Sequence, residues 1–108
     1  MSLSETAFHD LCGEHIARLQ DALEEQDTAG ILDIDGQDGM LSIVLEDGKT
    51  FIVSRHTAAR ELWLSSPVSG GHHFPPAAKG GWVLPDGRSF PALLLAEIKQ
   101  LTGIDFHA

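Results

Sequence analysis

Carboxylate side chains dominate the first 47 residues of the sequence. Twelve of the sixteen Asp and Glu residues lie there beside one basic residue, Arg18, which gives this segment a formal charge of −11. The rest of the chain, with four acids and six bases, carries +2. Carboxylates are hard oxygen ligands that suit Fe²⁺, Fe³⁺, Mn²⁺, Ca²⁺ or Mg²⁺, and an acidic field also attracts basic protein surfaces. The composition therefore predicts weak binding of cations at several carboxylates, or docking to a basic partner.

Six of these acids form the candidate cation-binding surface. They are Asp21, Glu24, Glu25 and Asp27 at the end of a predicted helix, and Asp33 and Asp35 on one face of the strand that follows. Acids four residues apart on a helix repel each other, and anions near a helix C-terminus oppose its dipole. That cost favours a functional surface over the alternative, a face that merely keeps the protein soluble. His9 could supply one further ligand, although an ordinary surface histidine would look the same in the sequence.

A tryptophan, Trp63, stands in a strand-like run over residues 60–65. Because side chains alternate along a strand, Leu62 and Leu64 share one face and the tryptophan takes the other. If helices cover the leucine face, the tryptophan is exposed on the open face, where such residues commonly mark binding hot spots. The sequence favours contact with a partner there over the alternative, packing against a neighbouring strand residue such as Arg55.

The remaining reactive residue types form no catalytic arrangement. His72 and His73 are adjacent, so on a strand they face opposite ways and cannot readily chelate one ion. Cys12 falls on an apolar helix face, which is typical of a small core residue rather than a reactive thiol. The glycine pairs at 70–71 and 80–81 lack the residues that follow in phosphate-binding loops. We therefore expect a protein without an active site of its own.

Two patterns of apolar spacing predict the elements that hold these residues. Spacings of three and four over residues 3–26 predict a helix, capped by Ser2 with Glu5 in a capping box or by Ser4 alone. Alternation predicts strands over 31–35, 40–46, 50–55 and 60–65, weaker strands at 72–74 and 82–84, and Asp-Gly turns at 38–39 and 47–48.

A second helix is predicted over residues 89–102, with Ser89 as its N-cap and Gly103 as its C-terminal stop. Short links imply antiparallel strands, and two helices with one apolar face each must cover one face of the sheet. The predicted fold is an α+β two-layer sandwich, an antiparallel sheet of about five to six strands with the N- and C-terminal helices packed on one face. Residues 1–108 are expected to form one domain.

The overall composition excludes several classes of protein. A net charge of −9 argues against nucleic acid as a partner, because its phosphates require Lys and Arg. No apolar stretch approaches the roughly 20 residues that a membrane-spanning helix needs, and the N-terminus shows no leader pattern. The single cysteine, Cys12, excludes an internal disulfide and fits a reducing compartment. A cytoplasmic location without membrane contact is expected.

At the level of motifs, the chain resembles the frataxin family, small iron-linked proteins of iron–sulfur cluster assembly, over nearly its whole length. The most specific match is Leu62-Trp63-Leu64-Ser65-Ser66-Pro67 with Ser69-Gly70. Supporting matches are Asp38-Gly39-Met40-Leu41, Trp82 with Asp86-Gly87, and Leu93-Leu94. The absence of a presequence makes the chain similar to a bacterial member.

The resemblance implies a non-enzymatic, iron-dependent regulator and iron donor, or iron chaperone, for cluster assembly. Weakly bound Fe²⁺ or Fe³⁺ would be held by the six carboxylates, with His9 at a position linked to metal binding in some bacterial members. The implied partners are a cysteine desulfurase, whose basic residues meet the acids, and the iron–sulfur scaffold protein, which faces Trp63. His73 and Arg60 are taken as further partner-facing residues. The protein is expected to be a monomer that iron could assemble into an oligomer, and whether it slows or accelerates assembly stays open.

Two alternatives remain at this point: a ferroxidase that stores iron in oligomers, and an acidic adaptor that needs no metal. A preformed di-iron centre would require facing carboxylates with histidines, a motif the sequence does not show. The chain also departs from the family. Ser54, His56, Ala59 and Glu61 replace the polar Asn and Gln residues common around the tryptophan, His73 replaces an arginine of mitochondrial members, and Ala29 and Ile31 replace acids of some bacterial members. These changes bear on iron affinity and scaffold contact, not on the fold.

Overall fold

The computed structural model describes residues 4–77 and 81–108, and its first element is the predicted amphipathic helix, α1 (Glu5–Gln26). The Ser4 side chain caps this helix by accepting a hydrogen bond from the Ala7 N–H at 3.1 Å. This confirms the predicted alternative in which Ser4 is the N-cap. The other candidate cap, Ser2, lies outside the described residues. All five residues of the predicted apolar stripe are buried: Phe8, Cys12, Ile16, Leu19 and Leu23.

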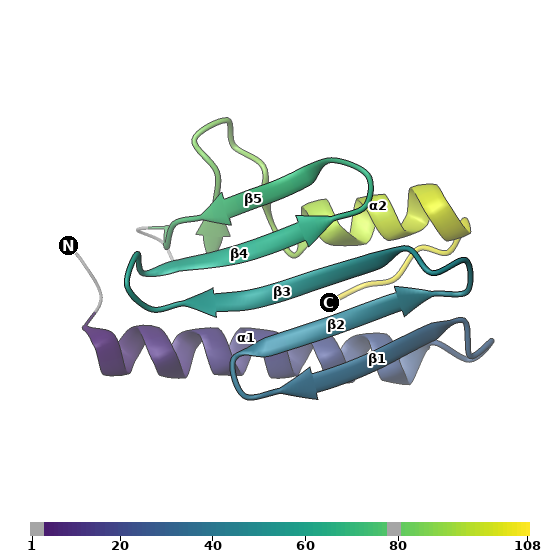
Figure 1. The fold of residues 1–108 in the computed structure, drawn as a ribbon, viewed down its shortest axis with the longest axis horizontal. Coiled ribbons are helices and arrows are strands. Elements are labelled where there is room, and N and C mark those ends of the chain that lie inside the picture. Colours follow the sequence, from purple (N-terminus) through teal and green to yellow (C-terminus); the bar gives the residue numbers. More distant parts are fainter. Residues whose placement is uncertain (1–3, 78–80) are drawn as a thin grey trace.

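Five antiparallel strands follow in chain order and form one sheet (Figure 1). They are β1 (Leu32–Gln37), β2 (Met40–Leu45), β3 (Thr50–His56), β4 (Glu61–Ser66) and β5 (Gly70–Phe74). Each strand pairs with the next, so β1 and β5 are the edges. The predicted alternation is confirmed in β2, where Leu41, Ile43 and Leu45 are buried and their neighbours only partly so.

The C-terminal part of the chain differs from the prediction at one boundary. Residues predicted as a further strand form β6 (Trp82–Val83), which pairs with β7 (Ser89–Phe90) in a separate two-stranded ribbon. Ser89 was predicted as the N-cap of the second helix, and this was wrong because Ser89 pairs with Val83 in that ribbon. The helix, α2 (Ala92–Thr102), begins after Pro91, which makes no side-chain capping bond. It ends, as predicted, at Gly103, whose left-handed backbone (φ 77°) suits glycine.

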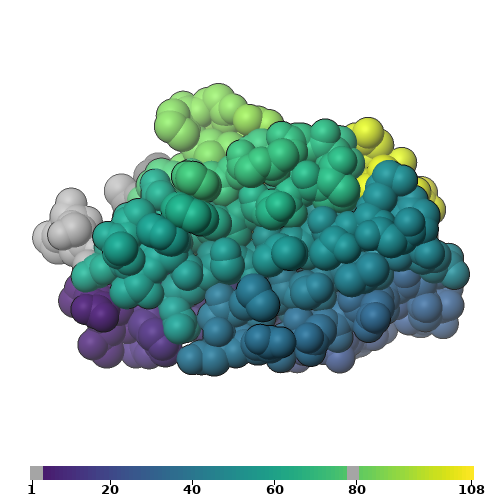
Figure 2. All heavy atoms as spheres, in the orientation of Figure 1, coloured from purple at the N-terminus to yellow at the C-terminus, as the bar shows by residue number. Residues whose placement is uncertain are grey.

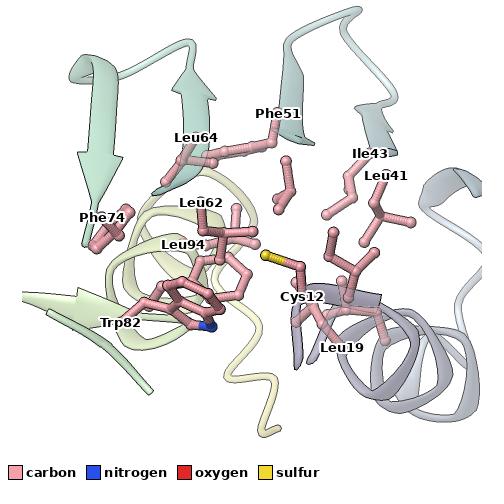
Figure 3. Packing of buried hydrophobic residues seen from close by; sticks show 14 of the residues in the cluster. Cys12, Leu19, Leu41, Ile43, Phe51, Leu62, Leu64, Phe74, Trp82 and Leu94 are labelled. Atoms are coloured by element: carbon pink, nitrogen blue, oxygen red, sulfur yellow. The ribbon is translucent and has the colours of Figure 1, made fainter. Parts of the chain in front are cut away.

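Both helices lie on the same side of the sheet, as predicted. The core fills the space between the helices and the sheet (Figures 1 and 3). Trp82 is fully buried there and packs edge-on against Phe8, with ring centroids 5.8 Å apart. The chain after α2 adds Phe106 to this core, and the Gln26 side-chain amide exchanges two hydrogen bonds with the backbone of His107. The opposite face of the sheet is uncovered and forms the surface seen in Figure 2. No helix within residues 4–77 and 81–108 is long and apolar enough to cross a membrane.

Candidate functional site

Three of the predicted ligands lie along the second half of α1. Asp21, Glu24 and Glu25 are exposed there, and the last turn of the helix contains no basic residue that could neutralise them. This half of α1 runs beside the edge strand β1 (Figure 1). The contact is close at Gly36, where an added Cβ would clash with the Gln20 side-chain amide. The helix carboxylates therefore stand next to one edge of the sheet.

Asp33 and Asp35 lie on β1 itself and point to the uncovered face. Leu32, before Asp33, and Ile34, between the two aspartates, pack against the core. Both aspartates are exposed. Strand alternation predicted this arrangement correctly. Asp33 is opposite Val44 and Asp35 is opposite Ser42, so no basic side chain faces either carboxylate across the β1–β2 pair. The edge of the sheet at β1 thus carries two carboxylates on its outer face and the acids of α1 behind it.

Asp27 has a different task from the other five acids. One carboxylate oxygen accepts a hydrogen bond from the Ile31 N–H at 3.0 Å, and the other accepts from the Leu32 N–H at 2.9 Å. The side chain therefore fixes the loop that turns the chain from α1 into β1. Its negative charge adds to the local field, and each oxygen already accepts one backbone hydrogen bond. Within the described residues, the predicted ligands that accept no backbone hydrogen bond are the other five acids.

The acids do not assemble into a preformed metal centre. Within the part of the chain that the structure describes, no three His, Cys, Asp or Glu side chains converge on one point. His9 is half-exposed and lies 3.8 Å from Asp10. It precedes Asp21 by twelve residues, which at 1.5 Å per residue places it about 18 Å away along the helix. His9 and the acidic edge are therefore separate positions, and what the acids offer is a row of single carboxylates.

Trp63 lies on the uncovered face of the sheet, as predicted, but it is half-buried rather than exposed. Its indole is stacked between two imidazoles, with centroids 3.8 Å from His56 at an interplanar angle of 6° and 4.0 Å from His73 at 8°. The indole Nε1 donates a hydrogen bond to Glu61 Oε1 at 3.1 Å. Both faces of the ring are covered, so a partner would meet its edge together with the two histidines.

Two arginines near Trp63 in the sequence lie elsewhere in the fold. Packing of the tryptophan against neighbouring strand residues is found for His56 and His73. Arg55 is the wrong example of it, because this residue follows the inward alternation of β3 and its guanidinium pairs with Asp38 at 3.6 Å. Arg60, predicted to face a partner, places its guanidinium 6.0 Å from the ring centroid of Phe8, a residue of the core. It also donates a hydrogen bond to the Thr57 carbonyl. Arg60 therefore does not join Trp63 and His73.

The adjacent histidine pair and the cysteine lie as the sequence predicts. His72 lies within 2.7 Å of Ser69 Oγ, whereas His73 stacks on Trp63, so the adjacent pair does face opposite ways. Burial raises the pKa of the Cys12 thiol to about 11, with a smaller opposing effect from Arg55. Such a thiol is a core residue and a poor nucleophile.

Comparison with known proteins identifies the family. A model of the Frataxin-like domain matches residues 1–104. The iron-sulfur cluster assembly protein CyaY of Pseudomonas fluorescens (strain Pf0-1) is 42% identical over 74 residues, which cover 68% of this chain and 64% of that protein. CyaY of Azotobacter vinelandii is 37% identical over 84 residues, covering 77% and 74%. Mitochondrial frataxin of Dictyostelium discoideum is 33% identical over 105 residues, covering 93% and 54%. The chain thus spans less than two thirds of the Pseudomonas and Dictyostelium proteins.

Solved structures share the fold. Frataxin from Psychromonas ingrahamii superposes with a TM-score of 0.84 at 21% identity, over 96% of both chains. A trimeric yeast frataxin from Saccharomyces cerevisiae, complexed with ferrous iron, superposes with a TM-score of 0.74 at 23% identity, over 96% of this chain and 90% of that one. The family model matches residues 1–104, and the solved frataxins share the layered fold, so the chain belongs to the frataxin family.

Proposed function

We propose that this protein acts in iron–sulfur cluster assembly as a non-enzymatic, iron-binding regulator that also donates iron. The observation that carries the proposal is the row of unneutralised carboxylates along the β1 edge, in a chain whose relatives include iron-sulfur cluster assembly proteins named CyaY. The ligands we assign are the five acids whose oxygens remain available: Asp21, Glu24, Glu25, Asp33 and Asp35.

The geometry supports weak rather than tight binding. Each exposed carboxylate supplies one or two oxygen ligands, and water completes the coordination of a hard cation held this way. Because no described group of three ligands converges, each iron ion would be bound loosely and exchange readily. That behaviour suits an ion that must be handed to another protein, and Fe²⁺ is cargo here rather than a resident cofactor.

A second surface, distinct from the acids, would contact the assembly machinery. Trp63 and His73 lie on β4 and β5, whereas the acids lie at β1, the opposite edge of the same sheet. We assign the acidic edge to the basic surface of a cysteine desulfurase and the tryptophan stack to the scaffold protein. The separation of the two surfaces predicts that iron binding and scaffold contact can be removed independently.

An anaerobic Fe²⁺ titration, followed by the backbone amide signals in NMR, tests the metal site. Amides over residues 21–35 should broaden or shift first. The double variant Asp33→Asn with Asp35→Asn should weaken that response, while the matched variant Asp86→Asn with Asp105→Asn, which removes two exposed carboxylates elsewhere, should not. An unmoved acidic edge combined with shifts around residues 72–74, or equal loss in both variants, would contradict the assignment.

Desulfurase-driven cluster formation tests the partner surface. Trp63→Ala should abolish the effect of the protein on the rate of cluster formation and leave the Fe²⁺ titration unchanged. Ile104→Ala is the control, because it truncates an exposed apolar side chain (36% accessible) beyond the end of α2. Unchanged activity in Trp63→Ala would remove the tryptophan from the interface. Oxygen uptake in step with loss of Fe²⁺ would instead support a ferroxidase.

A further inference from the structure

A small half-open pocket lies where α1 meets the junction between β7 and α2, and neither the acidic edge nor Trp63 lines it. Its volume is about 220 Å³. Leu19, Phe90 and Pro91 supply apolar walls, His15 and Arg18 supply the side-chain polar groups, and Gly81 and Ala108 complete the lining. Pockets for drug-sized ligands are typically larger, about 300 to 1,000 Å³, so this one fits only a small molecule.

The hydrogen bond from Trp82 decides what His15 can offer to this pocket. The indole N–H is a donor only, and it lies 2.7 Å from His15 Nδ1, which must therefore accept. In Figure 3 the indole nitrogen of Trp82 lies on the side of the ring away from Leu62 and Leu64. A neutral ring whose Nδ1 accepts must carry its proton on Nε2, so the free ring nitrogen is a hydrogen-bond donor. No residue within the described ranges accepts a bond from it.

The neutral state of His15 has a physical cause. Burial of the ring lowers its pKa, and the positive charge of Arg18 lowers it further, against a smaller opposing effect of Glu14. The ring also contacts Trp82 edge-on, with centroids 5.9 Å apart at 88°, which holds its orientation. His15 is therefore a fixed, neutral donor near pH 7.

Arg18 adds a positive charge to the acidic first 47 residues. It is the only basic residue among the first 47, and its Nη2 pairs with Glu14 at 2.6 Å. A guanidinium has five N–H donors in a planar fork, so one ion pair leaves others available. The pocket thus places two donors, one of them charged, beside three apolar walls.

From these contacts we propose that the pocket binds a small organic carboxylate, with its apolar part against Leu19, Phe90 and Pro91. Its carboxylate would accept hydrogen bonds from His15 Nε2 and the Arg18 guanidinium. A bare inorganic anion would leave the apolar walls in contact with water, and a neutral molecule would leave the guanidinium without a second partner. The net charge of −9 opposes an anion, but at 0.15 M salt that long-range term is screened beyond about 8 Å.

Amide NMR titrations at pH 7.5 with benzoate, benzyl alcohol and benzylamine test the proposal with probes of one shape and different charge. Benzoate should shift the amides of residues 15–19 and 90–92 in a saturable way. Benzyl alcohol should bind at least fivefold more weakly, and benzylamine should not bind. Benzyl alcohol binding as tightly as benzoate, or no saturable shift with benzoate at these residues, would overturn the proposal.

Variants of three exposed residues test which charge binds benzoate. Arg18→Gln should weaken benzoate about tenfold, the size expected for one charge-assisted hydrogen bond. Arg88→Gln is the matched control, since Arg88 forms the same kind of surface pair with Asp86 at 2.8 Å and does not line the pocket. Glu14→Gln should strengthen binding by freeing the guanidinium. Equal weakening by Arg18→Gln and Arg88→Gln, or weaker binding in Glu14→Gln at unchanged Tm, would show that Arg18 is not the anchor.

Discussion

Replacement of Asp27 separates an acid that holds the fold from the acids that we assign to iron. In Asp27→Ala the N–H groups of Ile31 and Leu32 lose the carboxylate that accepts their hydrogen bonds at 3.0 and 2.9 Å. The site is partly buried, so water replaces the lost bonds incompletely. Asp21→Ala is the matched control, because Asp21 is exposed on the same helix and removing it relieves charge repulsion.

The expected loss can be worked out from the two bonds. A hydrogen bond to a charged group contributes roughly 1.5 to 3 kcal/mol to the free energy of unfolding. Because the site is partly exposed and both bonds share one carboxylate, we expect the two bonds together to contribute about 2 to 3 kcal/mol. For a chain of 108 residues the entropy of unfolding near 60 °C is about 0.23 kcal/mol/K, so Tm should fall by about 9 to 13 °C. Asp21→Ala should leave Tm unchanged or raise it slightly.

Differential scanning calorimetry and the Fe²⁺ titration, made on the same variants, give the decisive comparison. Asp27→Ala should be clearly destabilised yet still show the amide response over residues 21–35 below its melting point. A Tm within 2 °C of the wild type would refute the structural role of Asp27. Loss of the iron response in Asp27→Ala, with no loss in the Asp33→Asn and Asp35→Asn variant, would refute the division of roles among the acids.

Three further predictions concern polar groups that are wholly or partly buried. The lowered pKa of His15 means that the unfolded chain binds the proton more tightly, so the free energy of unfolding should fall as pH drops below about 6.5, and urea melts should show a smaller fall in His15→Gln. With its pKa near 11, about one Cys12 thiol in a thousand is ionised at pH 8, so iodoacetamide should label it only after unfolding, as mass spectrometry would show. Ser66→Ala removes the hydroxyl that donates to the buried Glu97 at 2.7 Å, and urea denaturation should show a loss of about 2 kcal/mol that the exposed control Ser65→Ala does not share.

Local sequence patterns were sufficient for most of the fold. The stripe of α1, the inward residues of β2 and the stop at Gly103 follow from periodicity and from one backbone preference, and all three are confirmed. Ser89 failed because its local tendency to cap a helix was weaker than its pairing with Val83, which depends on how the chain returns after the Pro/Gly-rich loop. A boundary set by a distant partner leaves no local signal.

The candidate site shows the same division between local and long-range information. The outward direction of Asp33, Asp35 and Trp63 follows from strand alternation alone. The stack around Trp63 does not, because His73 reaches it through the β4–β5 register and His56, which is paired with Glu61, reaches it diagonally across β3–β4. The role of Asp27 likewise depends on the shape of one loop. Composition could mark these residues as polar, but it could not tell which contacts they would make.

The core joins the two ends of the chain, and this affects how the protein is made. Phe8 near the start packs against Trp82, and Phe106 completes the same cluster. Ribosomes release α1 first and the sheet strands next, so the sheet can cover part of the apolar stripe, but Phe8 lacks its packing partner Trp82 until residue 82 has emerged. A chain stalled before that point would expose the stripe to chaperones and to other nascent chains, which is the usual route to aggregation of incomplete domains. Completion of the core is therefore confined to the last stage of translation.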